Sequence, residues 1–201
     1  MTYDAVISDV GGVVVDMETD RLLHQVSQLV GRPFDEVQAA VYDKTLLLPF
    51  ELGKISAKTY YQELKKRLKL PWAYEQFTTF WTAIFTENRE VTHVLSRLSA
   101  RHRLVALTNT NELHLEYLKR SIPSLSFFCD WVASCDVGCR KPEPEIYHLA
   151  LRRAGVRADR AVYIDDRPEM VEAGRQVGLK AIRFEDSRQL ERELEALGIN
   201  A

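Results

Sequence analysis

The sequence predicts an α/β fold, a Rossmann-like doubly wound parallel sheet with a small α-helical cap domain. Two observations support this fold class. Short apolar runs alternate with helical patterns in the second half of the chain, which is typical of a parallel sheet covered by helices on both faces. The stretch between the first apolar run and that half has helical spacing and almost no strand pattern.

The predicted strands are short apolar runs that end in polar residues. The first covers residues 3–10 and carries Asp9 near its carboxyl end, before the pair Gly11-Gly12. Later strands are expected at residues 103–107, 161–164 and 180–184, and helices at residues 91–98, 143–155, 168–178 and 187–197. In such a sheet the carboxyl ends of the strands lie along one edge, where ligands bind.

Residues 18–85 form the predicted helical cap. Apolar side chains recur there at helical spacing, and proline and glycine residues separate the segments, at Pro33, Pro49, Gly53 and Pro71. The aromatic stripe at residues 77–85 is expected to be the core of this bundle. We predict a core domain of residues 1–16 and 87–201 and a cap domain of residues 17–86.

The composition fits one globular α/β domain with an insertion. Of 201 residues, 46% are hydrophobic and 28% charged, and the net charge of -2 offers no basic field for nucleic acid. The sequence has neither an apolar run of about 20 residues nor a signal-like start, so we expect a cytoplasmic protein without membrane partners. Three cysteines without a CxxC pair argue against a disulfide framework or a zinc site.

Polar residues at the predicted strand ends are the candidate functional residues. They are Asp9, Thr108, Asn109, Asp165 and Asp166, together with a loop lysine, Lys141. An acidic strand end is often only a helix cap, and a single lysine is usually solvated, so none of them is specific alone. Their expected position along the same sheet edge indicates a shared site.

These residues belong to four motifs in a fixed order. The motifs read ISDVGGVV, LTNTN, RKPEPEIY and YIDDRPEMVEAG. In order and spacing they resemble the motifs of the haloacid dehalogenase superfamily, over nearly the whole chain and including a helical cap after the first motif. The glycine after Asp9, the segment LTNTNELH and the cap segment LPWAYEQFTTFW are most similar to the bacterial sugar-phosphate phosphatases of that superfamily, in particular the α-glucose-1-phosphate phosphatase-like members.

The resemblance implies a nucleophile and a metal site. Asp9 would attack phosphorus to form an aspartyl-phosphate, which water then hydrolyses. Mg²⁺ would be bound by Asp9, the main-chain carbonyl of Gly11 and Asp166, since a hard cation prefers oxygen ligands. The positive charge is needed because two carboxylates and a phosphate dianion repel one another.

The resemblance also assigns the remaining motif residues. Lys141 would be catalytic and substrate-binding, because it neutralises charge on the transferring group. Thr108 and Asn109 would donate hydrogen bonds to phosphate oxygens, and Asp165 would orient Lys141 or a bound water. Together they imply a Mg²⁺-dependent phosphatase of a small phosphorylated metabolite, such as glucose 1-phosphate.

One position departs from the family's phosphatases. They carry a second aspartate two residues after the nucleophile, and this sequence has Gly11 there. That aspartate acts as general acid and base, a contribution worth about 10²–10⁴ in rate. We therefore expect esters with good leaving groups to react best, such as anomeric, aryl or acyl phosphates. Asp16, His24 or a residue of the cap could supply the proton instead.

Two other functions stay open at the level of the sequence. One is a 2-haloacid dehalogenase-type hydrolase, which also uses an aspartate nucleophile without the second aspartate; the pair Asp165-Asp166 argues against it, because it would repel an anionic acid. The other is a catalytically weak protein that binds a phosphate ligand or a partner. A mutase is a minor third option, and the oligomeric state does not follow from the sequence.

Overall fold

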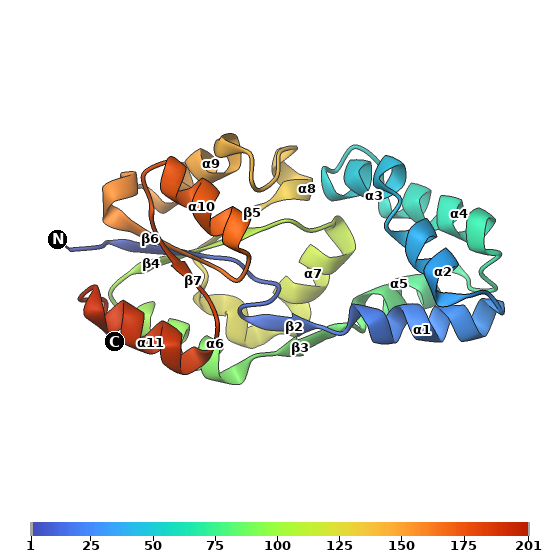
Figure 1. The fold of residues 1–201 in the computed structure, drawn as a ribbon, viewed down its shortest axis with the longest axis horizontal. Helices are drawn as coiled ribbons and strands as arrows, with labels where there is room; N and C mark the ends of the chain where they lie inside the picture. Colours follow the sequence, from blue (N-terminus) through green and yellow to red (C-terminus); the bar gives the residue numbers. More distant parts are fainter. Residues whose placement is uncertain (1, 201) are drawn as a thin grey trace.

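The computed structural model describes residues 2–200 and confirms the predicted fold class (Figure 1). Its main sheet has five strands in the order β5-β4-β1-β6-β7, and all neighbours run parallel. The strands are β1 (Ala5–Ser8), β4 (Arg103–Thr108), β5 (Asp130–Ala133), β6 (Ala161–Asp165) and β7 (Lys180–Arg183). Every residue of β1 is buried, as expected for the central strand of a sheet that is covered on both faces.

Helices cover both faces of this sheet. One face packs against α6 (Arg89–Leu98), α7 (Glu112–Ser121), α11 (Ser187–Ala196) and the short 3₁₀ helix η1 (Pro123–Phe127). The other packs against α9 (Pro144–Ala154) and α10 (Pro168–Gln176). Two further short elements are α8 (Ser134–Val137) and η2 (Ala158–Arg160). Successive residues of β1 serve the two faces in turn: Val6 joins the first cluster, and Ile7 the second.

Five helices form a cap with its own hydrophobic core, as predicted (Figure 1). They are α1 (Thr19–Val30), α2 (Phe34–Val41), α3 (Lys44–Glu51), α4 (Ala57–Leu68) and α5 (Tyr74–Thr82). The aromatic stripe is part of this core, where Phe77 stacks on Trp81 with ring centroids 5.3 Å apart. The expected break at Pro49 is wrong, because Pro49 lies inside the last turn of α3.

A two-stranded ribbon connects the cap to the core (Figure 1). In it, β2 (Val15–Met17) pairs antiparallel with β3 (Phe85–Glu87). Three-residue strands are too short for a reliable alternation signal, so the sequence did not predict this ribbon. It lies at both predicted domain boundaries; the division at residues 16/17 and 86/87 itself stays a prediction.

Within residues 2–200, none of the helices has both the length and the apolar composition needed to cross a membrane.

Candidate active site

The register of the sheet brings Asp9 to the centre of its carboxyl edge. Ser8 is aligned with Ala106 of β4 on one side and with Ile164 of β6 on the other. Asp9 is the next residue, and its N–H donates to the carbonyl of Ile164 at 2.8 Å. The side chain therefore emerges between the ends of the two neighbouring strands, the point where an open parallel sheet binds its ligands.

Lys141 is buried between two of the carboxylates. Its Nζ lies 2.7 Å from Asp9 Oδ2 and 2.6 Å from Asp165 Oδ2, and the residue is 1% exposed. The Tyr163 hydroxyl also donates to Asp165 Oδ2, and the N–H of Arg167 donates to Asp165 Oδ1 at 2.9 Å. A buried ammonium group needs this compensation, and the contacts hold it beside Asp9.

The pKa values of the three acidic side chains are not all shifted in the same direction. Burial raises the pKa of Asp9 to about 7, although Lys141 acts in the opposite direction. Burial also opposes ionisation of Asp165, but Lys141 and the hydrogen bonds it receives outweigh that effect and lower its pKa. The pKa of Asp166 is raised by burial and by the neighbouring Asp165. A cation near Asp9 and Asp166 would favour the ionised form of both.

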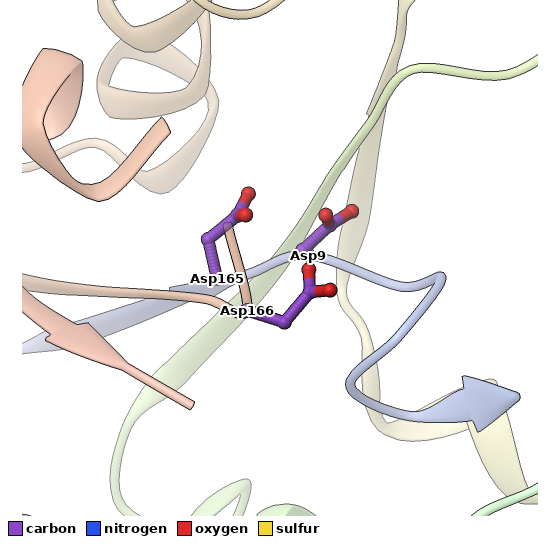
Figure 2. Close-up of side chains that lie close together, drawn as sticks. All are labelled: Asp9, Asp165 and Asp166. Carbon is purple, nitrogen blue, oxygen red and sulfur yellow. The ribbon is translucent and has the colours of Figure 1, made fainter. Parts of the chain in front are cut away.

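The acidic cluster fits an oxygen-liganded cation (Figure 2). Single carboxylate oxygens of Asp9, Asp165 and Asp166 lie within 4.8 Å of one another. Figure 2 shows that Asp165 and Asp166, although adjacent in sequence, point to different sides. Asp166 Oδ1 is buried without a hydrogen-bond partner among residues 2–200, and a Cβ at Gly12 would lie 2.6 Å from Asp166 Oδ2. A hard divalent cation would satisfy the buried oxygen, and glycine leaves room for it.

The second motif is tied to the lysine loop. The Asn109 side chain accepts a hydrogen bond from the Lys141 main-chain N–H at 2.8 Å and donates one to its carbonyl at 2.9 Å. This clamp was not expected from the sequence, and it leaves one amide N–H of Asn109 for a ligand. Thr108 is buried at the end of β4 and lines the same cavity.

A cavity of about 240 Å³ lies between the sheet edge and the cap. The core side contributes six of the seven residues predicted to form the site: Asp9, Gly11, Thr108, Asn109, Lys141 and Asp166. The seventh, Asp165, is fully buried and does not line the cavity. The cap side is mostly apolar and aromatic, and includes Leu22, Val41, Leu47, Trp81 and Ile84.

No acid replaces the missing aspartate at Gly11 itself. A Cβ there would lie 3.0 Å from the terminal methyl group of Met17, so the methionine side chain fills the adjacent space. Of the proton donors considered from the sequence, Asp16 and His24 do not line the cavity within residues 2–200. His24 instead packs on Phe34, with ring centroids 4.3 Å apart.

The sequence also missed the residues that join cap and core at the cavity. His114 Nε2 lies 3.0 Å from the Trp81 carbonyl, and its Nδ1 lies 3.1 Å from Asn111 Nδ2, which fits a neutral ring with the proton on Nε2. Burial lowers the pKa of His114 to about 4. Glu51 of α3 pairs with Arg140 at 2.8 Å. One signal was available for Glu51, because an acidic residue at a helix carboxyl terminus opposes the helix dipole.

Comparison with known proteins identifies the family. Residues 3–178 match the family model described as "Hydrolase: haloacid dehalogenase-like hydrolase". This match covers most of the chain and confirms the family resemblance seen in the four motifs.

Several known proteins are similar to this chain over most of their length. The D-ribitol-5-phosphate phosphatase of Bacteroides thetaiotaomicron is 24% identical, over 94% of this chain and 95% of the relative. The phosphorylated carbohydrates phosphatase of Thermotoga maritima is 28% identical, over 89% and 83%. The crystal structure of a HAD family enzyme from B. thetaiotaomicron, in complex with magnesium and inorganic phosphate, has a TM-score of 0.83 at 19% identity, covering 94% and 98%. The narrower resemblance to glucose-1-phosphate phosphatases stays a prediction.

Proposed function

We propose that this chain, which belongs to the haloacid dehalogenase-like hydrolases, is a Mg²⁺-dependent phosphatase of small phosphorylated metabolites. The observation that carries the proposal is the contact of Lys141 with Asp9 at the sheet edge, 2.7 Å apart, beside the unpartnered oxygen of Asp166. A nucleophilic carboxylate, a fixed positive charge and room for a cation are the groups that phosphoryl transfer requires.

Asp9 acts as the nucleophile. Its carboxylate attacks phosphorus, the bond from phosphorus to the leaving oxygen breaks, and that oxygen departs with the bonding electrons and takes up a proton. Water then attacks phosphorus of the aspartyl-phosphate, which releases inorganic phosphate and restores the carboxylate. The N–H of Val10 donates to Asp9 Oδ1 at 2.7 Å and holds the side chain in place for both steps.

Asp9, the carbonyl of Gly11 and Asp166 would hold the magnesium ion. When bound, the ion supplies positive charge that screens the carboxylates from the phosphate and stabilises charge on the transferring group. The buried, unpartnered oxygen of Asp166 supports this ligand set. The HAD family enzyme of similar fold that was solved with magnesium and inorganic phosphate supports magnesium as the metal.

The other motif residues position the phosphate. The Lys141 ammonium neutralises an oxygen of the transferring group, and Asp165 orients Lys141 through the 2.6 Å contact. The Thr108 hydroxyl and the free N–H of the Asn109 amide donate to phosphate oxygens. The clamp between Asn109 and the Lys141 main chain couples the two phosphate-binding loops.

The proposed substrates are sugar or polyol phosphates, with glucose 1-phosphate as one candidate. The names of two relatives, a ribitol-phosphate phosphatase and a phosphatase of phosphorylated carbohydrates, support this class. A cavity of about 240 Å³ suits a small ester. We further propose that residues 17–86 form the cap domain that selects the ester, in a cytoplasmic enzyme.

The absence of an acid at Gly11 makes the rate depend on the leaving group. We expect the rate constant for phosphate release to fall steeply as the pKa of the leaving alcohol rises, because the oxygen must depart with little protonation. A series of substituted phenyl and alkyl phosphates measures this slope. A flat dependence would show that another side chain donates the proton.

A Mg²⁺-dependent screen of phosphate esters tests the function. Wild-type protein should release phosphate only with the metal, and Asp9→Asn should lose activity by on the order of 10⁴-fold or more, because the nucleophile is removed. A 2-haloacid serves as a probe in the same screen. Halide release without added Mg²⁺, with no release of phosphate from any ester, would favour the dehalogenase instead.

A further inference from the structure

We propose that Glu51 determines specificity, as the cap residue that accepts a hydrogen bond from a hydroxyl group in the non-phosphate part of the substrate. This inference rests on the proposed phosphatase function. Glu51 is the last residue of α3 and lines the cavity that also holds Asp9. Of the carboxylates lining that cavity, Asp9 and Asp166 are committed to the reaction and the cation, and Glu51 is the third.

Two contacts tie Glu51 to the phosphate-binding loops, one of them through Ser134. The Ser134 hydroxyl donates to the Glu51 carbonyl at 2.7 Å and accepts from the N–H of Thr110 at 2.9 Å. Arg140, next to Lys141, lies 2.8 Å from Glu51 Oε2. A specificity residue must be held at a fixed place relative to the reacting phosphorus, and these bonds provide that.

The backbone packing reinforces this placement. Gly53, two residues after Glu51, has φ +66°, and a Cβ there would lie 2.1 Å from the carbonyl oxygen of Cys135. The end of α3 therefore approaches α8 as closely as a residue without a side chain permits, and Figure 1 shows the two elements side by side. The cap is anchored to the core at the point where it presents Glu51.

The ion pair with Arg140 engages one of the two carboxylate oxygens of Glu51. Arg140 lies 2.8 Å from Oε2, and the proposed ligand contact is made by Oε1. The side chain is 19% exposed, and its pKa is raised by burial. A residue that only connected the cap to the core would need no acidic side chain in the cavity. The hydrogen bond from the Ser134 hydroxyl to the Glu51 carbonyl already makes that connection.

The surroundings select a neutral hydroxyl group. Arg140 compensates the charge of Glu51, and Arg167 is a second nearby cation, so the site has no excess negative charge for an ammonium group. The rest of the cap wall is largely apolar, with Tyr42, Trp81 and Phe85 as its aromatic members. Aromatic rings pack well against the C–H faces of a polyol, and a carboxylate oxygen binds its hydroxyl groups.

The test compares substrates with and without hydroxyl groups. In Glu51→Met, which keeps the side-chain length but removes both oxygens, kcat/KM for glucose 1-phosphate or ribitol 5-phosphate should fall by about 10- to 100-fold, the effect of a lost hydrogen bond to a charged group. Most of the loss should be in KM. p-Nitrophenyl phosphate, which has no hydroxyl group, should change by less than about threefold. Glu51→Gln should recover part of the loss, because an amide still bonds a hydroxyl.

Controls separate this role from a structural one. Glu36→Met, on the exposed surface of the cap, should leave all three substrates unchanged. Arg140→Met breaks the ion pair but keeps the carboxylate, and it should not reproduce the substrate discrimination. Equal losses of kcat/KM on all substrates in Glu51→Met would overturn the inference, since a residue that only connects the cap to the core would affect all substrates alike. No Mg²⁺-dependent hydrolysis by wild type would instead overturn the proposed function itself.

Discussion

The two walls of the cavity are built in opposite ways. The core wall is charged and buried, and in it Lys141 lies between the carboxylates of Asp9 and Asp165. The cap wall is apolar and aromatic, with a single carboxylate, Glu51, on it. Fixed charges suit the transfer of the phosphoryl group, a step that is common to all phosphate esters. An apolar surface with one hydrogen-bond acceptor suits the recognition of the rest of the substrate, which differs from ester to ester. The proposed function therefore assigns chemistry and selectivity to different parts of the chain.

The largest effect is expected at the charged wall. Lys141→Met should lower the free energy of unfolding by about 3–5 kcal/mol, because it leaves Asp9 and Asp165 buried without a counter-charge. Chemical denaturation measures the change. Lys44→Met, on the exposed start of α3, should change it by less than about 0.5 kcal/mol. Equal stability of the two variants would contradict the buried ion-pair account.

The contact between His114 of the core and Trp81 of the cap should stabilise the fold less at acidic pH. His114 has a folded-state pKa of about 4, below its ordinary 6.5, so the unfolded chain takes up a proton first. The stabilisation it provides is complete above pH 6.5 and is lost as the pH falls towards 4, by up to about 3 kcal/mol. Thermal unfolding across this range should show a smaller pH dependence in His114→Gln than in wild type.

The exposed His93 provides a control for the His114 variant. His93→Gln should keep the wild-type pH dependence of thermal unfolding. If His114→Gln and wild type lose stability in parallel between pH 6.5 and 4, the destabilisation comes from other groups and His114 does not hold the cap in this way.

A smaller effect is expected at Gly12. It should show whether this glycine is needed to leave room for the cation or only for its backbone conformation. Gly12 and Gly138 both have positive φ, +78° and +73°, but only at Gly12 would a Cβ meet Asp166. Gly12→Ala and Gly138→Ala should each lose about 1 kcal/mol of stability. Only Gly12→Ala should also raise the Mg²⁺ concentration for half-maximal activity, by about 10- to 100-fold. A similar shift in both variants would contradict the assignment of Asp166.

The sequence predicted the core wall well and the cap wall poorly. Thr108 is the last residue of a short buried strand, and Asp9 and Asp166 directly follow two others. A parallel sheet brings such strand ends together whatever the loops do. The cap residues at the cavity come from helices that are apolar on several sides, so spacing alone could not show which side faces the site. The three-residue strands β2 and β3 were missed because they are too short to show a period.

Long-range polar contacts were also beyond the sequence. Ser134 joins Glu51 to Thr110 across 83 and 24 residues, and the clamp between Asn109 and Lys141 spans 32. No local pattern records such partners, because a serine or asparagine in a loop is equally suited to a turn. The sequence also offered Asp16 and His24 as possible proton donors in place of the aspartate missing at Gly11, and within residues 2–200 neither of them lines the cavity.

The most direct test of the central claim is to trap the phosphorylated protein. Acid quenching during Mg²⁺-dependent turnover of p-nitrophenyl phosphate, followed by peptide mapping with mass spectrometry, should find one phosphoryl group on Asp9 and none in Asp9→Asn. A phosphoryl group on a different residue, or undiminished hydrolysis by Asp9→Asn, would contradict the account.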